Sequence, residues 1–174
     1  MPALCTERLD LWPITLPFVA ALMSGDREGA EAVCGAPLPI AWPGPDLIAR
    51  AFAPSIEAVR ADPDTRLWGD TLLIARIGPR RVVGSVVFHG RPRDGIAEVG
   101  YGIDEIEQRQ GFATEGTRAC VEWALAEPGV TAVQATTFPW HTASLRVIER
   151  LGLQPCGQRD HPFLGELLIF EKRK

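Results

Sequence analysis

Residues 108–115, with the sequence Gln-Arg-Gln-Gly-Phe-Ala-Thr-Glu, form a small-residue turn that opens an amphipathic helix directly after an alternating strand. Such a junction points several backbone N–H groups and the positive end of a helix dipole at one place, which suits a phosphate. The P-loop pattern is absent, since the only lysines are Lys172 and Lys174. Residues 100–102 (Gly-Tyr-Gly) begin like a dinucleotide fingerprint, but the third glycine is missing and they lie inside a predicted strand. The turn therefore predicts a phosphate-bearing ligand of another kind.

The elements that position this turn are predicted from residue 72 onward. Strand-like alternation over 72–77, 82–88 and 96–103, with turns between, indicates an antiparallel meander. A helix is expected over about 113–127 and a strand over 130–138, and this strand should lie parallel to the one that ends at Ile103. Thr142 is the expected N-cap of a short helix that stops at Gly152, and a last strand is expected over 163–170.

The first 69 residues predict less. Residues 6–12 alternate loosely and indicate a first strand, and 14–23 is apolar at helical spacing. Four prolines between 37 and 45 require a loop, and a helix over 46–60 is expected to start again or kink at Pro54. The whole pattern predicts one domain over 1–174, of the α/β (α+β) class, with a mixed, mostly antiparallel central sheet flanked by helices.

The composition argues against several classes of function. The chain is 46% hydrophobic and 23% charged, as in a globular protein, and no apolar run approaches the length of a membrane span. No signal peptide is visible, so no membrane association is expected. The net charge of −4 argues against nucleic acid as a partner. The four scattered cysteines form no C-x-x-C pair, which favours a reduced, cytoplasmic setting, and no metal site is expected.

Three blocks of the chain resemble the GNAT superfamily of N-acetyltransferases. Residues 108–113 match the [Q/R]-x-x-G-x-[G/A] signature of that family, and the likeness continues through Gly116. Residues 139–153 look like the N-x-x-S-x-x-x-x-x-x-x-G-F element of the branch that acetylates the N-terminal alanine or serine of ribosomal proteins. Residues 6–11 resemble the first strand of the same branch. The blocks cover 6–12 and 72–170 in the expected order.

The resemblance implies acetyl-CoA as the donor and a parallel, splayed strand pair at the CoA site. In the family, the amides of the turn hold the CoA pyrophosphate, and the preceding strand pairs with the pantetheine arm. His141 stands where the family has asparagine; it could donate a hydrogen bond to the pantetheine, act as a base, or be a solvated loop residue. The implied donor site comprises Ile103, Gln108, Arg109, Gln110, Gly111, Phe112, Ala113, Thr114, His141 and Ser144.

Acetyl transfer requires a neutral amine, so a general base helps at neutral pH. The resemblance implies Glu98, which lies on the strand that ends at Ile103, as the first candidate for this base. Its alternative is a surface residue that faces Arg91 or Arg93. Glu166 is the second candidate and His89 the third.

Ser144 matches the serine of the N-x-x-S element and is expected to contact CoA or its sulfur. Alternatively, its hydroxyl bonds locally at the start of a helix. Many family members place a general-acid tyrosine after the second helix. The only tyrosine of this chain is Tyr101, within a predicted strand, so that role is unfilled.

The resemblance thus implies an N-acetyltransferase that moves acetyl from acetyl-CoA to a primary amine, by direct transfer in a ternary complex. The branch favours a protein N-terminus as the acceptor. A small-molecule amine and a non-catalytic, acyl-CoA-binding GNAT-fold module are the alternatives. Trp42, Phe52 and Trp68 fall in the region that shapes the acceptor site in the family, where they could line an entrance or pack in the core. A homodimer is an open alternative to a monomer.

Overall fold

Eight strands form a continuous sheet in the order β1-β2-β3-β4-β5-β6-β8-β7. The structure is a computed structural model that describes residues 4–174, except for the side chains of residues 64–66. Every neighbouring pair of strands is antiparallel apart from β5 and β6, which are parallel. The predicted mixed, mostly antiparallel sheet is therefore confirmed. The strands are Leu4–Cys5 (β1), Leu9–Pro13 (β2), Asp70–Ala75 (β3), Arg81–Phe88 (β4), Ile96–Ile103 (β5), Ala132–Thr137 (β6), Gln154–His161 (β7) and Gly165–Arg173 (β8).

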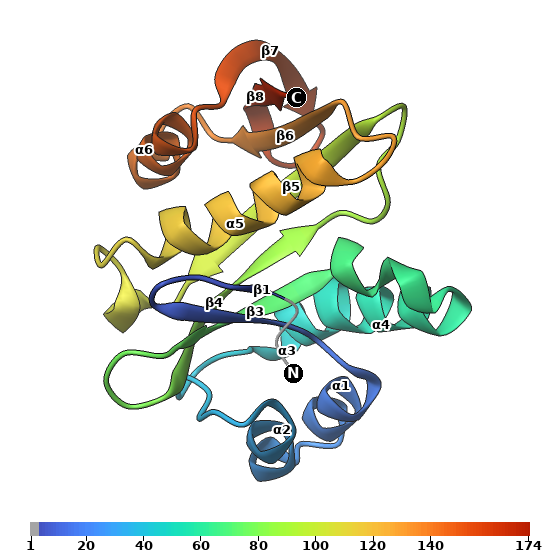
Figure 1. The fold of residues 1–174 in the computed structure, drawn as a ribbon, viewed down its shortest axis with the longest axis vertical. Coiled ribbons are helices and arrows are strands. Elements are labelled where there is room, and N and C mark those ends of the chain that lie inside the picture. Colours follow the sequence, from blue (N-terminus) through green and yellow to red (C-terminus); the bar gives the residue numbers. More distant parts are fainter. Residues whose placement is uncertain (1–3) are drawn as a thin grey trace.

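Helices cover both faces of this sheet, and Figure 1 shows α5 crossing in front of β4 and β5. The α1 and α2 pair lies at the opposite end of the molecule from the β7–β8 hairpin (Figure 1). Across the described residues, no helix is long and apolar enough to cross a membrane. The helices are Leu16–Met23 (α1), Arg27–Cys34 (α2), Pro45–Leu47 (α3), Ile48–Phe52 (η1, a π-helix), Ala53–Ala61 (α4), Pro63–Trp68 (η2, 3-10), Glu105–Glu107 (η3, 3-10), Phe112–Ala126 (α5) and Thr142–Leu151 (α6).

Two buried clusters hold the helices to the sheet, one on each face. Alternate residues of a strand point to opposite faces, so Leu73 packs under α5 while Leu72 packs under α1 and α4. The same alternation in β5 sends Val99 and Tyr101 toward the α5 side. Glu98, Gly100 and Gly102 therefore point to the opposite face of the sheet.

The parallel pair opens partway along its length. β5 and β6 are in register from Ile96 opposite Ala132 to Glu98 opposite Gln134, and both strands continue beyond that point. The backbones of β5 and β6 are thus left without each other as partners toward their carboxyl ends. This confirms the predicted parallel pair and places its open end beside the start of α5.

Two expected strands form with shifted bounds, one cap is assigned to another residue, and one strand was not expected. Residues 6–12 are not one strand, because residues 6–8 form the bend between β1 and β2. The expected last strand does form, as β8 over Gly165–Arg173 rather than 163–170, but β7 before it was not expected. The N-cap of α6 is His141 rather than Thr142. The helix expected over 46–60 forms over 45–61, and, as expected, a new α-helix (α4) starts at this point, with Pro54 in its first turn after the π-helical turn η1.

Candidate functional site

The turn that was predicted to bind phosphate lies between η3 and α5. Gly111 is the N-cap of α5 with φ +85°, and Arg109 has φ +64°, so two of three successive residues are left-handed. Residues other than glycine rarely adopt this backbone conformation, so two such residues in close succession mark a sharp bend in the chain. Residues 108–110 are exposed. The turn therefore presents its backbone to solvent at the open end of the parallel pair.

The first amide groups of α5 are available to an anion. The N–H groups of Phe112, Ala113 and Thr114 precede the first hydrogen bond of the helix, which Glu115 donates to the Gly111 carbonyl at 3.0 Å. Among the described side chains, none caps this helix end. A Cβ on Gly111 would lie 3.2 Å from Arg8 Nη2, so glycine leaves this backbone bare. The residues present fit a diphosphate, which would accept from these amides at the positive end of the helix dipole.

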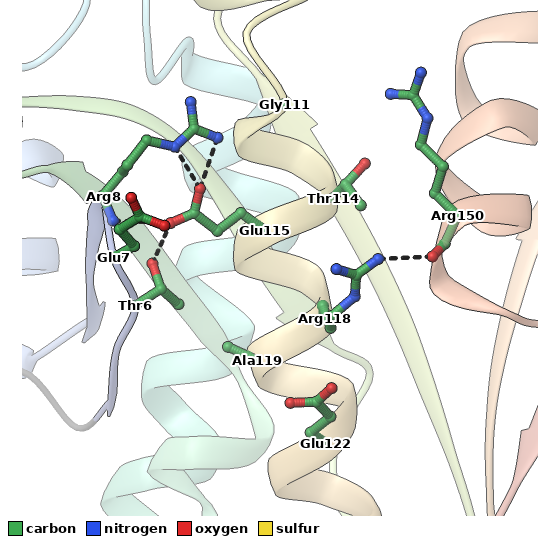
Figure 2. A pocket seen from close by; sticks show the side chains of 10 residues that line it. All are labelled: Thr6, Glu7, Arg8, Gly111, Thr114, Glu115, Arg118, Ala119, Glu122 and Arg150. Atoms are coloured by element: carbon green, nitrogen blue, oxygen red, sulfur yellow. Dashed lines mark hydrogen bonds and ion pairs between the residues drawn. The ribbon is translucent and has the colours of Figure 1, made fainter.

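An open cavity of about 510 Å³ lies along the exposed side of α5 next to the turn (Figure 2). Gly111, Thr114 and Arg118 line it from α5, Arg8 lines it from the β1–β2 bend, and Arg150 closes it from α6. Arg118 donates to the Arg150 carbonyl at 2.8 Å. The guanidinium groups around this cavity offer further charge-assisted partners for the phosphorylated end of a nucleotide.

Two of the predicted donor-site residues contact each other. Gln108 Nε2 donates to the Ile103 carbonyl oxygen at 3.2 Å. A pantetheine amide that donates to this carbonyl oxygen would either share it with the exposed Gln108 side chain or displace that side chain. The roles predicted for Ile103 and Gln108 stay predictions.

Glu98 lies at the point where the parallel pair opens. Its carboxylate accepts from Arg159 Nη2 of β7 at 3.2 Å, and its side chain is 34% exposed. The arginine that pairs with Glu98 is therefore Arg159 of β7, and the expected alternative partner Arg91 pairs with Asp62 instead. An exposed ion pair of this kind contributes little free energy, so a substrate ammonium can replace Arg159.

The other two candidate bases lie in different positions. His89 follows β4 and is exposed, and its Nε2 would lie 3.4 Å from a Cβ on Gly100, on the same face as Glu98. Glu166 lies opposite Asp160 near the tip of the β7–β8 hairpin. The neighbouring pair of this hairpin, Arg159 opposite Leu167, reaches Glu98 through the Arg159 side chain. The backbone N–H of His89 donates to the Glu98 carbonyl oxygen at 3.0 Å, so these two residues come together, whereas no hydrogen bond or ion pair among the described residues joins Glu166 to them.

Ser144 is linked across the open pair to Tyr101. The Tyr101 hydroxyl donates to the Ser144 carbonyl at 3.1 Å and lies 3.0 Å from Ser144 Oγ. Burial raises the pKa of Tyr101 above its ordinary value, while the hydrogen bond with Ser144 acts in the opposite direction. Tyr101 was not expected to take the place of the general-acid tyrosine that many family members carry after the second helix. It nevertheless contacts the predicted catalytic serine, and it does so from strand β5.

His141 begins α6 and contributes a side-chain cap. Its Nδ1 accepts from the Ser144 N–H at 3.3 Å, which fixes the first turn of the helix that carries the serine. The ring stacks on Trp140, with centroids 5.7 Å apart. Because Nδ1 is occupied as an acceptor, Nε2 is the atom that remains for a ligand.

The aromatic residues predicted for an entrance or the core belong to the core. Trp42 packs edge-on against Phe52 at 5.7 Å, under α1 and α4. Trp68 packs against Trp123 at 4.6 Å in the cluster on the other face. They support the sheet from both sides.

Sequence reasoning missed four residues at this site: Arg8, Glu115, Arg159 and Tyr101. Each reaches the site by a contact between distant parts of the chain, and Arg8 and Glu115 lie 107 positions apart. The only signal in the sequence was that Arg8 and Glu115 fall in two of the blocks that resemble one family.

A sheet with an opened parallel pair, beside a bare helix start that suits a diphosphate, defines an acyltransferase that takes its acyl group from a CoA thioester. Residues 21–154 match the acetyltransferase (GNAT) domain family, and the chain belongs to that family. It is an N-acetyltransferase that uses acetyl-CoA.

Known proteins similar to this chain include one curated relative and two solved structures. The uncharacterized N-acetyltransferase YjdG of Bacillus subtilis is 24% identical over 153 residues, which cover 87% of this chain and 89% of YjdG. The ribosomal-protein-S5-alanine acetyltransferase of Vibrio fischeri has a TM-score of 0.69 at 14% identity, covering 98% of this chain and 95% of that one. RimL, a ribosomal L7/L12 α-N-protein acetyltransferase solved with CoA, has a TM-score of 0.66 at 16% identity, covering 97% and 95%. The two structures share the fold.

Proposed function

We propose that this enzyme acetylates the α-amino group of a protein N-terminus, by direct transfer from acetyl-CoA in a ternary complex. The observation that carries this proposal is the open strip on the face of β5 opposite α5. Gly102 is exposed there, and a Cβ on it would have no heavy atom within 4 Å. Gly100 faces only Val87 and His89.

This strip leads to Glu98, so it fits a chain end that lies along the sheet with its first amine at the carboxylate. A small-molecule site is usually concave and buries most of the ligand surface. The bare glycines offer backbone and space instead of such an enclosure. The names of the Vibrio fischeri and RimL structures support the same acceptor class, since both are protein acetyltransferases.

The proposed reaction uses residues of β5 together with residues of the turn, α5 and α6. The amides from Gln110 to Thr114 hold the diphosphate of the donor, and the pantetheine arm lies toward Ile103. Glu98, acting through a water molecule, takes a proton from the substrate ammonium. The amine then attacks the thioester carbon, the C–N bond forms and the C–S bond breaks, and the proton that the nitrogen loses as it becomes an amide protonates the departing CoA sulfur. The CoA thiolate departs toward the Ser144 hydroxyl; a thiol pKa of about 8.5 makes it a fair leaving group.

Peptides with free N-termini test the acceptor class directly. We expect thiol release from acetyl-CoA with peptides that begin with serine or alanine, and mass spectrometry should place the acetyl group on the α-amine. The matched control is the same peptide with a blocked N-terminus and one internal lysine. A higher kcat/KM with polyamines or free amino acids would overturn the proposal in favour of a small-amine acceptor. Stabilisation by acetyl-CoA without turnover of any amine would favour an acyl-CoA-binding module.

A further inference from the structure

We infer that Arg8, held by Glu115, is a positioning residue that shapes the donor-binding turn from the N-terminal end of the chain. The inference rests on the proposed donor site at this turn. It assigns a role in cofactor use to the bend between β1 and β2, which lies outside the residues that the turn itself contributes.

Glu115 anchors Arg8 through both of its carboxylate oxygens. Arg8 Nε and Nη2 reach Oε2 at 2.7 and 2.6 Å, and the Arg8 backbone N–H donates to Oε1 at 2.9 Å. The Thr6 hydroxyl donates to Oε1 at 2.5 Å. Figure 2 shows Thr6 and Arg8 both pointing at Glu115 on the first turn of α5. Because each oxygen has several donors, the guanidinium is held in one orientation.

The position of this pair between sheet and helix strengthens it. The side chain of Arg8 is 32% exposed and that of Glu115 is 19% exposed. Burial alone would raise the pKa of Glu115, but the hydrogen bonds from Thr6 and from the Arg8 backbone and side chain outweigh it, so the pKa is lowered. The carboxylate therefore stays ionised across the pH range in which acetyl transfer is measured.

The same guanidinium group also contacts the donor-binding turn. Its Nη1 donates to the Gln110 carbonyl oxygen at 2.9 Å, and its guanidinium carbon lies 4.9 Å from the centroid of the Phe112 ring. In a planar trans peptide the carbonyl and the following N–H point in opposite directions. Fixing the Gln110 carbonyl on Arg8 therefore turns the Gly111 N–H away from the guanidinium.

This turn needs such support because Arg109 and Gly111 are both left-handed. Backbone held in a sparsely populated conformation persists only when its surroundings determine it. Arg8 contacts the carbonyl between these two residues and the ring that follows them, so it fixes the turn on both sides of Gly111. Without Arg8 the amides would no longer be set in advance for the diphosphate.

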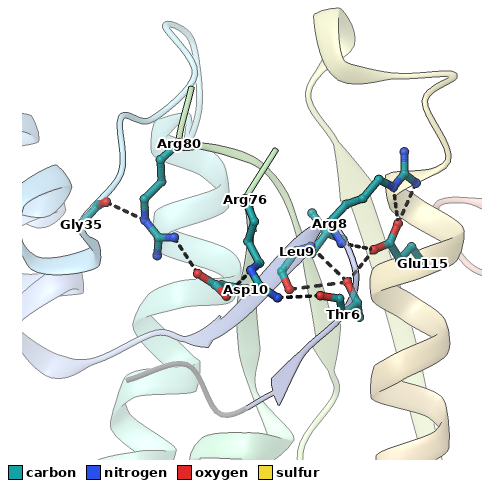
Figure 3. Close-up of polar contacts among 8 residues, drawn as sticks. All are labelled: Thr6, Arg8, Leu9, Asp10, Gly35, Arg76, Arg80 and Glu115. Carbon is teal, nitrogen blue, oxygen red and sulfur yellow. Dashed lines mark hydrogen bonds and ion pairs between the residues drawn. The ribbon is translucent and has the colours of Figure 1, made fainter. Parts of the chain in front are cut away.

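A second arginine that pairs with a residue of β2 offers a matched control. Arg80 donates to Asp10 Oδ2 of β2 at 2.6 Å and to the Gly35 carbonyl at 3.0 Å. Figure 3 shows this pair beside the Arg8–Glu115 pair, directed toward Gly35 and away from α5. Arg80→Ala thus removes an arginine ion pair anchored on β2 without touching the turn.

The test compares acetyl-CoA with S-acetylpantetheine, which carries the same thioester but no diphosphate. For Arg8→Ala we expect the ratio of kcat/KM for acetyl-CoA to that for S-acetylpantetheine to fall about tenfold, the effect of a lost charge-assisted contact. CoA should also bind more weakly by calorimetry, which does not depend on turnover. Arg80→Ala should keep the wild-type ratio, and near-wild-type thermal unfolding would show that each variant is folded.

Two further variants separate the ways in which the inference can fail. Glu115→Gln should lower the ratio as well, because Arg8 loses its anchor; a ratio that stays or rises would show that Arg8 acts directly and would overturn the positioning role. Gly111→Ala tests the donor site itself. If Gly111→Ala lowers the ratio and Arg8→Ala does not, the inference is wrong while the donor site stands. If neither changes it, the proposed donor site is wrong too.

Discussion

Asparagine in place of Asp70 is expected to flatten the dependence of the free energy of unfolding on pH. Asp70 opens β3, its side chain is 2% exposed, and its Oδ2 has no hydrogen-bond partner among the described residues. Burial raises the pKa of Asp70 from 3.8 to about 7, although a hydrogen bond with Ser55 of α4 acts in the opposite direction. This carboxyl group takes no part in the proposed reaction.

The sign and size of the effect follow from proton binding. Between about pH 4 and pH 7 the folded protein keeps a proton that the unfolded chain has lost, so stability falls as the pH rises through this window. Above about pH 7 the loss is complete. A pKa difference of about 3 units corresponds to at most about 4 kcal/mol. That is a large share of the roughly 5–15 kcal/mol that stabilises a typical domain.

Urea unfolding at a series of pH values measures the effect. Asp70→Asn cannot ionise, so the stability difference between variant and wild type should shift in favour of the variant as the pH rises from about 5 to 8. Any cost of the new amide group is independent of pH and leaves this shift intact. Asp160→Asn, on the exposed strand β7, is the control and should follow the wild type. Parallel stability curves for wild type and Asp70→Asn would refute the reasoning.

Four further substitutions test the site and its support. Glu98→Gln should lower the acetylation rate by about a hundredfold near neutral pH and less at alkaline pH, where the amine is already neutral; an unaltered pH–rate profile would remove Glu98 as the base. Ser144→Ala and Tyr101→Phe should each lower kcat by about tenfold. The double variant should have the same kcat as Ser144→Ala, because Tyr101 acts through the serine. Losses in kcat that add up in the double variant would contradict that link. Glu107→Gln should remove stability that is present above the ordinary carboxylate pKa and lost in acid, since a hydrogen bond from Arg81 lowers the pKa of Glu107. Unfolding scans from about pH 3 to 6 measure this, and identical acid profiles would count against it.

The elements that sequence predicted well have one buried face. β5 alternates between the core under α5 and a more exposed face, and α5 repeats small and apolar residues at helical spacing, so periodicity alone located them. β7 has no such signal, because Gln154–Asp160 are all exposed and the strand forms at the sheet edge by pairing with β8. A strand with no buried face has no alternation of apolar and polar residues by which it could be predicted from the sequence.

The residues of the candidate site also fall into two groups, those that local sequence predicts and those that depend on contacts between distant parts of the chain. The turn at Gly111 was predictable because its chemistry depends on the local backbone, and Ser144 because it belongs to a local block that resembles the family. The partners of these residues were not predictable, since Tyr101 and Ser144 lie 43 positions apart and Arg8 and Glu115 lie 107 apart. Their contacts exist only after the sheet has formed.

Strand β5 fixes the distance between the two halves of the proposed reaction. Glu98 lies where β5 and β6 part, and Ile103 ends the strand about 17 Å further on, close to the turn. A donor held by its diphosphate at the turn must reach back along this length to bring its thioester to Glu98. Any shift of the turn is therefore passed on to the thioester, and misplacement of about 1 Å can cost two orders of magnitude in rate. Weakening the Arg8–Glu115 pair should consequently lower kcat with acetyl-CoA as well as donor affinity, whereas losing an ordinary surface ion pair should affect neither.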